Sequence, residues 1–296
     1  MKRLLTIAAV AVVLYVAAYV VYRTGHTQVW AEDGKPYIIF GSRASWYLFR
    51  PITRLDAAAT SMRFHLGPHR DSPRTLVDRA ITAAGGAEQL TALRAFEWRG
   101  RAAVAAGGRT LQMSGLWRLQ PPDSAVVTMT LAGQPAASAR TLIIAGARGW
   151  TRVARSITPL APELVAHERD LFYLYHLIRL VPLRGSGYRL APLASDSLGR
   201  RRIRVSHARR PDVDLSFDAT GNLAGLADSV TDPQSHARVL QEVTIAGRFA
   251  VGGVRWPRRI IITWDGKPYF DLEILELRPL PQLVDPLLSG RVLTRR

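Results

Sequence analysis

Residues 162–182, PELVAHERDLFYLYHLIRLVP, form the only long apolar stretch outside the extreme N-terminus. Pro162 suits the first position of a helix, and Pro182 suits its end. Between them, leucines and aromatic residues recur at helical spacing and widen the apolar face until little of it is left for water. The stretch therefore predicts one buried helix that needs cover on most of its circumference.

The segments on both sides of this helix predict short strands separated by glycine, proline and aspartate turns. Short connections favour antiparallel neighbours, because a parallel return needs a crossover of about a dozen residues or more. The expected fold class is α+β, with one large curved antiparallel sheet and helices against it. Ser72 is suited to cap a first helix that begins at Pro73 and ends at Gly85 and Gly86.

The N-terminus carries a second apolar run. Lys2 and Arg3 precede residues 4–22, which contain no charged side chain. At about 1.5 Å per residue these positions span roughly 28 Å, close to the hydrocarbon thickness of a bilayer. The basic flank favours a cytoplasmic N-terminus, so we expect a single-pass protein of the inner (cytoplasmic) membrane whose C-terminal domain is periplasmic or extracellular. The alternative is a signal peptide cleaved after Ala31, but the run exceeds the usual ~7–15 apolar residues, which favours an uncleaved anchor.

These patterns divide the chain into four parts. We expect a transmembrane anchor, then a linker or membrane-proximal segment, then one folded domain and a C-terminal tail, at residues 1–23, 24–72, 73–280 and 281–296.

The second of these parts is mixed in character. Asp33 and Gly34 predict a turn. Trp46, Tyr47 and Phe49 stand beside two arginines, and two interpretations are open. The rings either sit at the membrane interface, where amphipathic aromatic side chains favour the headgroup level, or they pack on the folded domain.

The net charge of +17 comes almost entirely from arginine. This composition favours charge dispersed over a solvated surface, and attraction to anionic lipid or another polyanion is the alternative. The densest cluster, GRRRIRVSHARR at residues 199–210, has apolar residues alternating into it and so predicts a strand with one charged face. No nucleic-acid-binding motif accompanies the cluster, and we expect no nucleic-acid partner.

Patterns for catalysis and metal binding are poor. The absence of cysteine excludes thiol catalysis, disulfides and thiolate-bound zinc. His167 and Glu168 resemble the start of a zinc-protease motif, but residue 171, where the second histidine belongs, is Leu171. Asp212 and Asp214 alternate on a predicted strand near a turn, where carboxylates are usually solvated. We therefore expect no enzyme, no catalytic residue, no metal and no cofactor.

Four short motifs stand in the predicted domain: LVDRAI at residues 76–81 followed by two glycines, FEWRG at 96–100, GLW at 115–117, and Phe217-Asp218 before Gly221. Together they resemble the LolA/LolB-like superfamily of periplasmic lipoprotein carriers over about residues 73–277. The resemblance implies a strongly curved half-barrel whose concave face holds acyl chains or peptides, without enzymatic activity. The chain departs from the secreted carriers in its uncleaved span, and from the outer-membrane receptor in lacking a lipidated cysteine.

The surplus of aromatic residues in the domain has two interpretations. It either fills an ordinary core or lines a cavity for a hydrophobic ligand. We expect the lining of that cavity to be Trp98, Trp117, Phe172, Tyr175 and Ile178.

The expected function is non-catalytic binding of a lipid, lipoprotein or other hydrophobic ligand by a membrane-anchored envelope protein. The alternative is a structural or signalling envelope protein that binds a protein partner and has a filled core. An envelope hydrolase is the weakest hypothesis, because no nucleophile pairs with a base in the sequence.

Overall fold

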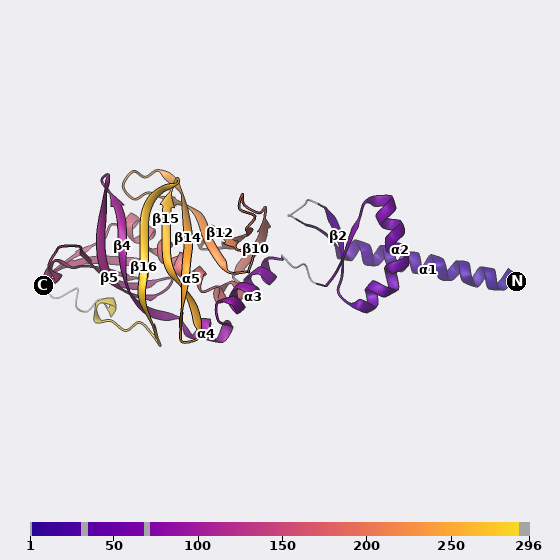
Figure 1. Ribbon diagram of the computed structural model, residues 1–296, viewed down its shortest axis with the longest axis horizontal. Coiled ribbons are helices and arrows are strands. Elements are labelled where there is room, and N and C mark those ends of the chain that lie inside the picture. Colours follow the sequence, from indigo (N-terminus) through magenta and orange to yellow (C-terminus); the bar gives the residue numbers. More distant parts are fainter. Residues whose placement is uncertain (1, 31–34, 68–71, 290–296) are drawn as a thin grey trace.

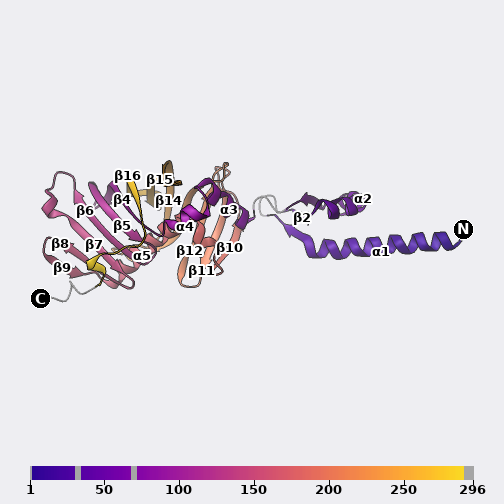
Figure 2. The ribbon, with the colours of Figure 1, turned by 90° about the horizontal axis from the view of Figure 1, so that it is seen from below.

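The computed structural model describes residues 2–30, 35–67 and 72–289. These residues form a long N-terminal helix with a small module on it, followed by a large curved sheet (Figures 1 and 2). Outside the described residues lie Ala31 of the alternative cleavage site, the expected turn at Asp33 and Gly34, residues 68–71 of the expected linker, and residues 290–296 of the expected tail.

The large sheet confirms the predicted α+β class. It has thirteen strands in the order β10-β11-β12-β13-β14-β15-β16-β4-β5-β6-β7-β8-β9, and every neighbouring pair is antiparallel. The strands are β4 Ala95–Ala106, β5 Arg109–Gln120, β6 Ser124–Leu131, β7 Arg140–Ala145, β8 Arg148–Val153, β9 Ser156–Pro159, β10 Tyr188–Leu193, β11 Arg201–His207, β12 Arg210–Phe217, β13 Leu223–Thr231, β14 Arg238–Val251, β15 Val254–Trp264 and β16 Lys267–Leu280.

The order of the strands gives the central helix its place. The first and last strands of the domain, β4 and β16, pair in the middle of the sheet, so its two edges are β9 and β10. Helix α5, Pro162–Ile178, joins these edges and runs along the concave side of the sheet (Figure 2). The helix ends where Leu180 takes a positive φ of 60°, before the short 3-10 helix η2, Val181–Arg184.

Helix α5 is buried mainly over its second half, which corrects the expectation of a helix covered on most of its circumference. The residues from Phe172 to Leu180 are buried apart from the half-buried His176, whereas in the first half Val165 is buried and Pro162, Glu163 and Leu164 are exposed. The first half carries Glu163, Glu168, Arg169 and Asp170. Such charges are costly to bury, and they hold this half at the boundary with water.

Two shorter helices cover part of the same concave side. Helix α3, Pro73–Ala83, is capped as predicted, because the Ser72 hydroxyl accepts a hydrogen bond from the Thr75 amide at 3.2 Å. Helix α4, Ala87–Ala92, follows at once. The turn between them needs glycine, since Gly85 has a φ of 115° and a Cβ there would lie 2.1 Å from the carbonyl oxygen of Gly253.

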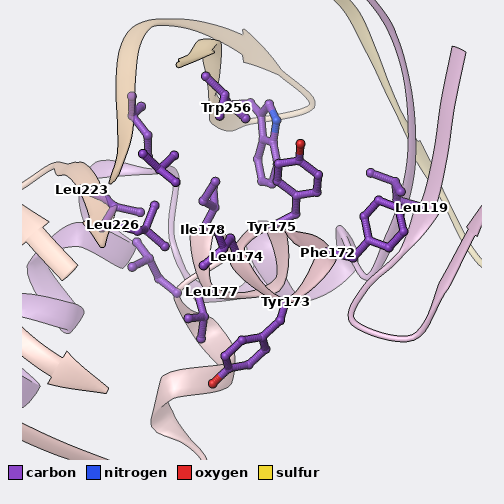
Figure 3. Close-up of a cluster of buried hydrophobic side chains, with 14 of the residues drawn as sticks. Leu119, Phe172, Tyr173, Leu174, Tyr175, Leu177, Ile178, Leu223, Leu226 and Trp256 are labelled. Atoms are coloured by element: carbon purple, nitrogen blue, oxygen red, sulfur yellow. The ribbon is translucent and has the colours of Figure 1, made fainter. Parts of the chain in front are cut away.

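The interior beneath α5 is filled with aromatic rings. The ring of Trp98 stacks on Phe96 at 5.1 Å and meets Tyr175 edge-on at 5.2 Å between centroids. Phe96 also lies 5.3 Å from Trp256. In Figure 3, Tyr175 points toward Trp256 while Phe172 points toward Leu119. These contacts belong to one core that extends from α3 to β16.

The N-terminal module gives regular structure to much of the segment expected as a linker. Helix α1, Lys2–His26, is followed by a three-stranded sheet and one further helix, with β1 Thr27–Val29, β2 Pro36–Phe40, α2 Arg43–Thr60 and β3 Arg63–Leu66. Tyr19, Ile38, Phe40, Phe49 and Met62 form its own small core. Thus Phe49 and Trp46 pack on α1 and β2, whereas Tyr47 is exposed.

The described part of the expected tail packs on the outside of the sheet. Leu287, in the 3-10 helix η3 Pro286–Ser289, covers Val126 and Ile143. Asp285 forms an ion pair with Arg118 at 2.6 Å. Residues 281–289 therefore belong to the folded domain.

Candidate functional site

An apolar groove of about 420 Å³ lies at one end of the concave face, on strands β5 to β8. Its walls are Leu111, Met113, Met129, Leu131, Gln134, Ser138, Arg140 and Val153. Two of these residues, Met113 and Met129, also pack against the core under α5. The groove is thus an open continuation of the same inner surface.

Strand alternation places these side chains on the inner face. Along β5 the residues Leu111, Met113, Gly115, Trp117 and Leu119 share one face, because successive residues of a strand point to opposite sides. Trp117 and Leu119 are buried in the core, so the first two residues of this row also face inward.

The register of the sheet then brings groove residues of different strands together. Met113 lies opposite Leu131, and Met129 lies opposite Arg140. Arg140 in turn lies opposite Val153. Cross-strand partners on one face are close enough for their side chains to touch, so the strands form one continuous strip that is apolar apart from Arg140.

The strip is exposed although it is apolar. Leu111, Leu131 and Val153 are 36%, 43% and 45% exposed. Methionine is unbranched and adapts to irregular partners, so Met113 and Met129 suit a flexible apolar ligand. An exposed apolar surface of this kind, continuous with a core, is the candidate site of this chain.

Trp117 forms the boundary between the groove and the filled core. Its ring lies over Gly115, since a Cβ on Gly115 would lie 2.9 Å from Cζ3 of the indole. Gly115 therefore has to be glycine for the ring to lie flat on the strand.

Arg140 lines the groove, and its positive charge acts on the carboxyl group of Glu168. The Arg140 Nε donates a hydrogen bond to the Thr151 hydroxyl at 2.8 Å. Burial raises the pKa of Glu168, on the first half of α5, to about 7, and the positive charge of Arg140 opposes this rise. The apolar strip thus has one cationic and one titratable group close to it.

A second pocket of about 280 Å³, lined by both polar and apolar residues, lies between α5 and strands β12 to β14. His167 and Asp170 line it together with Arg238. The His167 Nε2 lies 3.2 Å from the Tyr269 hydroxyl, and burial lowers the pKa of His167. Burial raises the pKa of Asp170, against the charges of Arg210, Arg169 and Arg238.

The structure places the five residues predicted to line a cavity inside the packed core. Trp98, Trp117, Phe172, Tyr175 and Ile178 are all buried in one cluster. Ile178 lines a small cavity of about 20 Å³. The role of these five in ligand binding stays a prediction.

The residues that line the groove were not predicted as site residues. Their signal in the sequence is alternation along two predicted strands, which core positions show equally. What distinguishes them is the lack of a helix above them, and that depends on the path of α5.

The other motif residues have structural partners. Asp214 accepts hydrogen bonds from Arg202 at 3.1 Å and Arg204 at 2.7 Å, which confirms one charged face on this strand. The Asp218 carboxylate accepts hydrogen bonds from the Thr220 and Asn222 amides and holds its turn. Among the described residues, no group of three or more His, Asp or Glu side chains is placed to hold a metal ion.

No protein family model matches the sequence, and no curated protein matches it. Among the solved structures similar to this chain are three that are covered over almost their whole length. A LolA superfamily protein from Nitrosomonas europaea is 12% identical, with 73% of this chain and 97% of that chain covered and a TM-score of 0.47. A putative outer membrane lipoprotein-sorting protein domain from Vibrio parahaemolyticus is 10% identical (74% and 100% covered, TM-score 0.44).

The third is a DUF1329 family protein from Desulfovibrio piger, 10% identical, with 74% of this chain and 97% of that chain covered and a TM-score of 0.46. The description of the fold rests on the strand order of this chain itself.

Proposed function

We propose that this chain is a membrane-anchored envelope protein that binds a lipid, lipoprotein or other hydrophobic ligand, without catalysis, in the groove of its concave face. The observation that carries the proposal is the exposed apolar strip of Leu111, Leu131 and Val153 with Met113 and Met129. Each CH₂ group buried there contributes about 0.8 kcal/mol. A short stretch of acyl chain therefore suffices to offset the cost of ordering it.

Helix α1 supports the anchor. Its segment Ala9–His26 has a mean hydropathy of 1.3, and 6% of that segment is buried inside the protein. The basic residues at its start favour a cytoplasmic N-terminus and a periplasmic domain. An anchored protein holds its ligand near the membrane, which suits reception or transfer at the bilayer surface.

The filled core supports a second candidate, a structural or signalling protein that binds a protein partner. In this case the aromatic rings of Phe96, Trp98, Tyr175 and Trp256 serve stability alone. The groove would then receive apolar side chains of the partner.

Native mass spectrometry of gently purified protein separates the two candidates. Leu131→Asp puts a charge into the apolar groove, and we expect at least a ~10-fold loss of co-purifying lipid, equivalent to about 1.4 kcal/mol or more. Leu240→Asp is the matched control, because Leu240 is 49% exposed on β14 and does not line the groove. Lipid retained by α1 is the same in both variants. Equal lipid in both, or a lipid-free protein with a stable protein partner, contradicts the proposal.

A further inference from the structure

Helix α2 has an outward face that no other described element covers. Phe49 and Thr53 are buried against the module, and the opposite side of the helix is exposed. Among the exposed residues are three large apolar ones, with Tyr47 63%, Leu48 59% and Leu55 71% exposed. A small soluble module gains nothing from presenting these side chains to water.

The exposed side of α2 is divided into two sectors. At about 100° per residue, one sector is an apolar stripe and the other is a basic edge. The stripe consists of Ala44, Tyr47, Leu48, Pro51, Leu55 and Ala58. The basic edge consists of Arg43, Arg50 and Arg54, and no ion pair joins these three to an acidic side chain within the part of the chain that the structure describes.

The only acidic residue of α2 is turned the other way. Asp56 forms an ion pair with Arg23 of α1 at 3.0 Å and accepts a hydrogen bond from the Tyr19 hydroxyl. Its charge is therefore compensated inside the module, and the outward face of α2 is purely apolar and basic.

Helix α2 lies across α1 at a defined level (Figures 1 and 2). The Tyr15 hydroxyl donates to the Leu48 carbonyl at 2.8 Å, and Tyr19 reaches Asp56. Tyr19 and Tyr15 precede Tyr22, the last residue of the uncharged run, by roughly 5 and 10 Å along the helix axis. Interfacial helices bury their apolar face by about 5–10 Å, which matches these levels if Tyr22 marks the edge of the hydrocarbon.

The position of the apolar stripe along α1 also suits a helix at a membrane surface. Leu48 adjoins Tyr15, the tyrosine nearer to the N-terminus, so the apolar stripe lies toward the uncharged part of α1. At about 100° per residue, the basic edge lies on the border of the stripe opposite to Leu48. In a bilayer this order puts apolar side chains deeper than arginines.

From this geometry we propose that α2 is an interfacial helix lying in the phospholipid headgroup layer of the bilayer that α1 crosses. Its stripe enters the boundary with the acyl chains, and Arg43, Arg50 and Arg54 bind lipid phosphates, which guanidinium groups recognise through paired hydrogen bonds. The inference rests on the proposed anchor and not on the groove.

Site-directed spin labelling tests the inference in the full chain. The natural sequence contains no cysteine, so single cysteines can be introduced without background. The protein is placed in vesicles of phosphatidylethanolamine and phosphatidylglycerol, with nitroxides at Leu48→Cys or Leu55→Cys. Leu198→Cys, an exposed leucine between β10 and β11, reports on water, and Val13→Cys reports on the span.

We expect the labels at Leu48 and Leu55 to be accessible to oxygen and shielded several-fold from a water-soluble nickel complex, relative to the label at Leu198. If they match the label at Leu198 while the label at Val13 is shielded, the interfacial helix is wrong and the anchor stands. If the label at Val13 is also in water, the anchor itself fails. Replacing Arg43, Arg50 and Arg54 with glutamine should make the Leu55 label shallower, and an unchanged depth overturns the role of the arginines.

Discussion

Glu168 and Arg140 place a titratable charge and a fixed charge close to the groove. Burial raises the pKa of Glu168 from 4.5 to about 7. The folded state thus favours the protonated carboxyl, and this contribution to stability is complete below about pH 4.5 and is lost as the pH rises through about 7. A shift of this size corresponds to roughly 3–4 kcal/mol.

Glu168→Gln should remove this pH dependence. The neutral amide avoids the cost of an ionised buried carboxylate, so we expect the melting temperature of the variant to exceed that of the natural protein by several degrees at pH 8 and to match it near pH 4.5. Thermal unfolding followed by circular dichroism at the two pH values measures the difference. Glu163→Gln, on the exposed first turn of the same helix, is the matched control. A gain for Glu168→Gln that is equal at both pH values contradicts the assignment.

Single residues also show which property could not be predicted from the sequence, namely the exposure of inward-facing side chains. Alternation along β5 identifies the inner face correctly, since Trp117 is buried and Leu111 points to the same side. It does not distinguish the two, because the exposure of an inward side chain depends on whether α5 lies above it. The core residues were therefore found, and the groove was not.

At the scale of elements, the two halves of α5 differ in burial. Its second half is a core element, and its first half lines the pocket against β12 to β14. Gly149 of β8 permits this position, because a Cβ there would lie 2.9 Å from a methyl carbon of Val165. The helix thus closes one end of the concave face and leaves the other open.

Two substitutions in α5 test this division. Phe172→Ala should cost about 3–5 kcal/mol in the free energy of unfolding, the usual cost of an aromatic-to-alanine change in a filled core. Leu164→Ala, in the exposed first turn, should cost less than about 1 kcal/mol. Urea denaturation of the two variants measures both values. A small cost for Phe172→Ala together with weaker ligand binding would show instead that this residue lines a cavity.

Elements were predictable where turn chemistry marks them. The capped helix after Ser72 is present as expected, because a capping hydroxyl acts locally. Helix α2 was missed, since it contains Pro51 and its apolar residues divide between a buried face and an exposed one. Strand β9 has four residues, too few to show a period.

At the scale of the whole molecule, the chain has two cores. The core of the large domain begins at Leu76, and the core of the N-terminal module ends at Phe64. From Gly67 to Ser72 an extended chain spans at most about 18 Å, so the domain starts close to the module. If α2 lies in the headgroup layer, the domain is held near the bilayer surface, where a hydrophobic ligand is drawn from or delivered to lipid.

Separate cores predict that the large domain folds without the module. A fragment of residues 72–296 should be monomeric and soluble and should melt within a few degrees of the domain in the full chain, because none of the described residues before Leu76 belongs to its core. Calorimetry of the fragment and of the full chain in detergent compares the two. Phe49→Ala in the full chain is the control, since it removes a core ring from the module alone and should leave the transition of the domain unchanged. A fragment that aggregates or melts far lower, or a domain transition shifted by Phe49→Ala, would mean that the module and the domain stabilise each other, and the anchor would then be part of the fold.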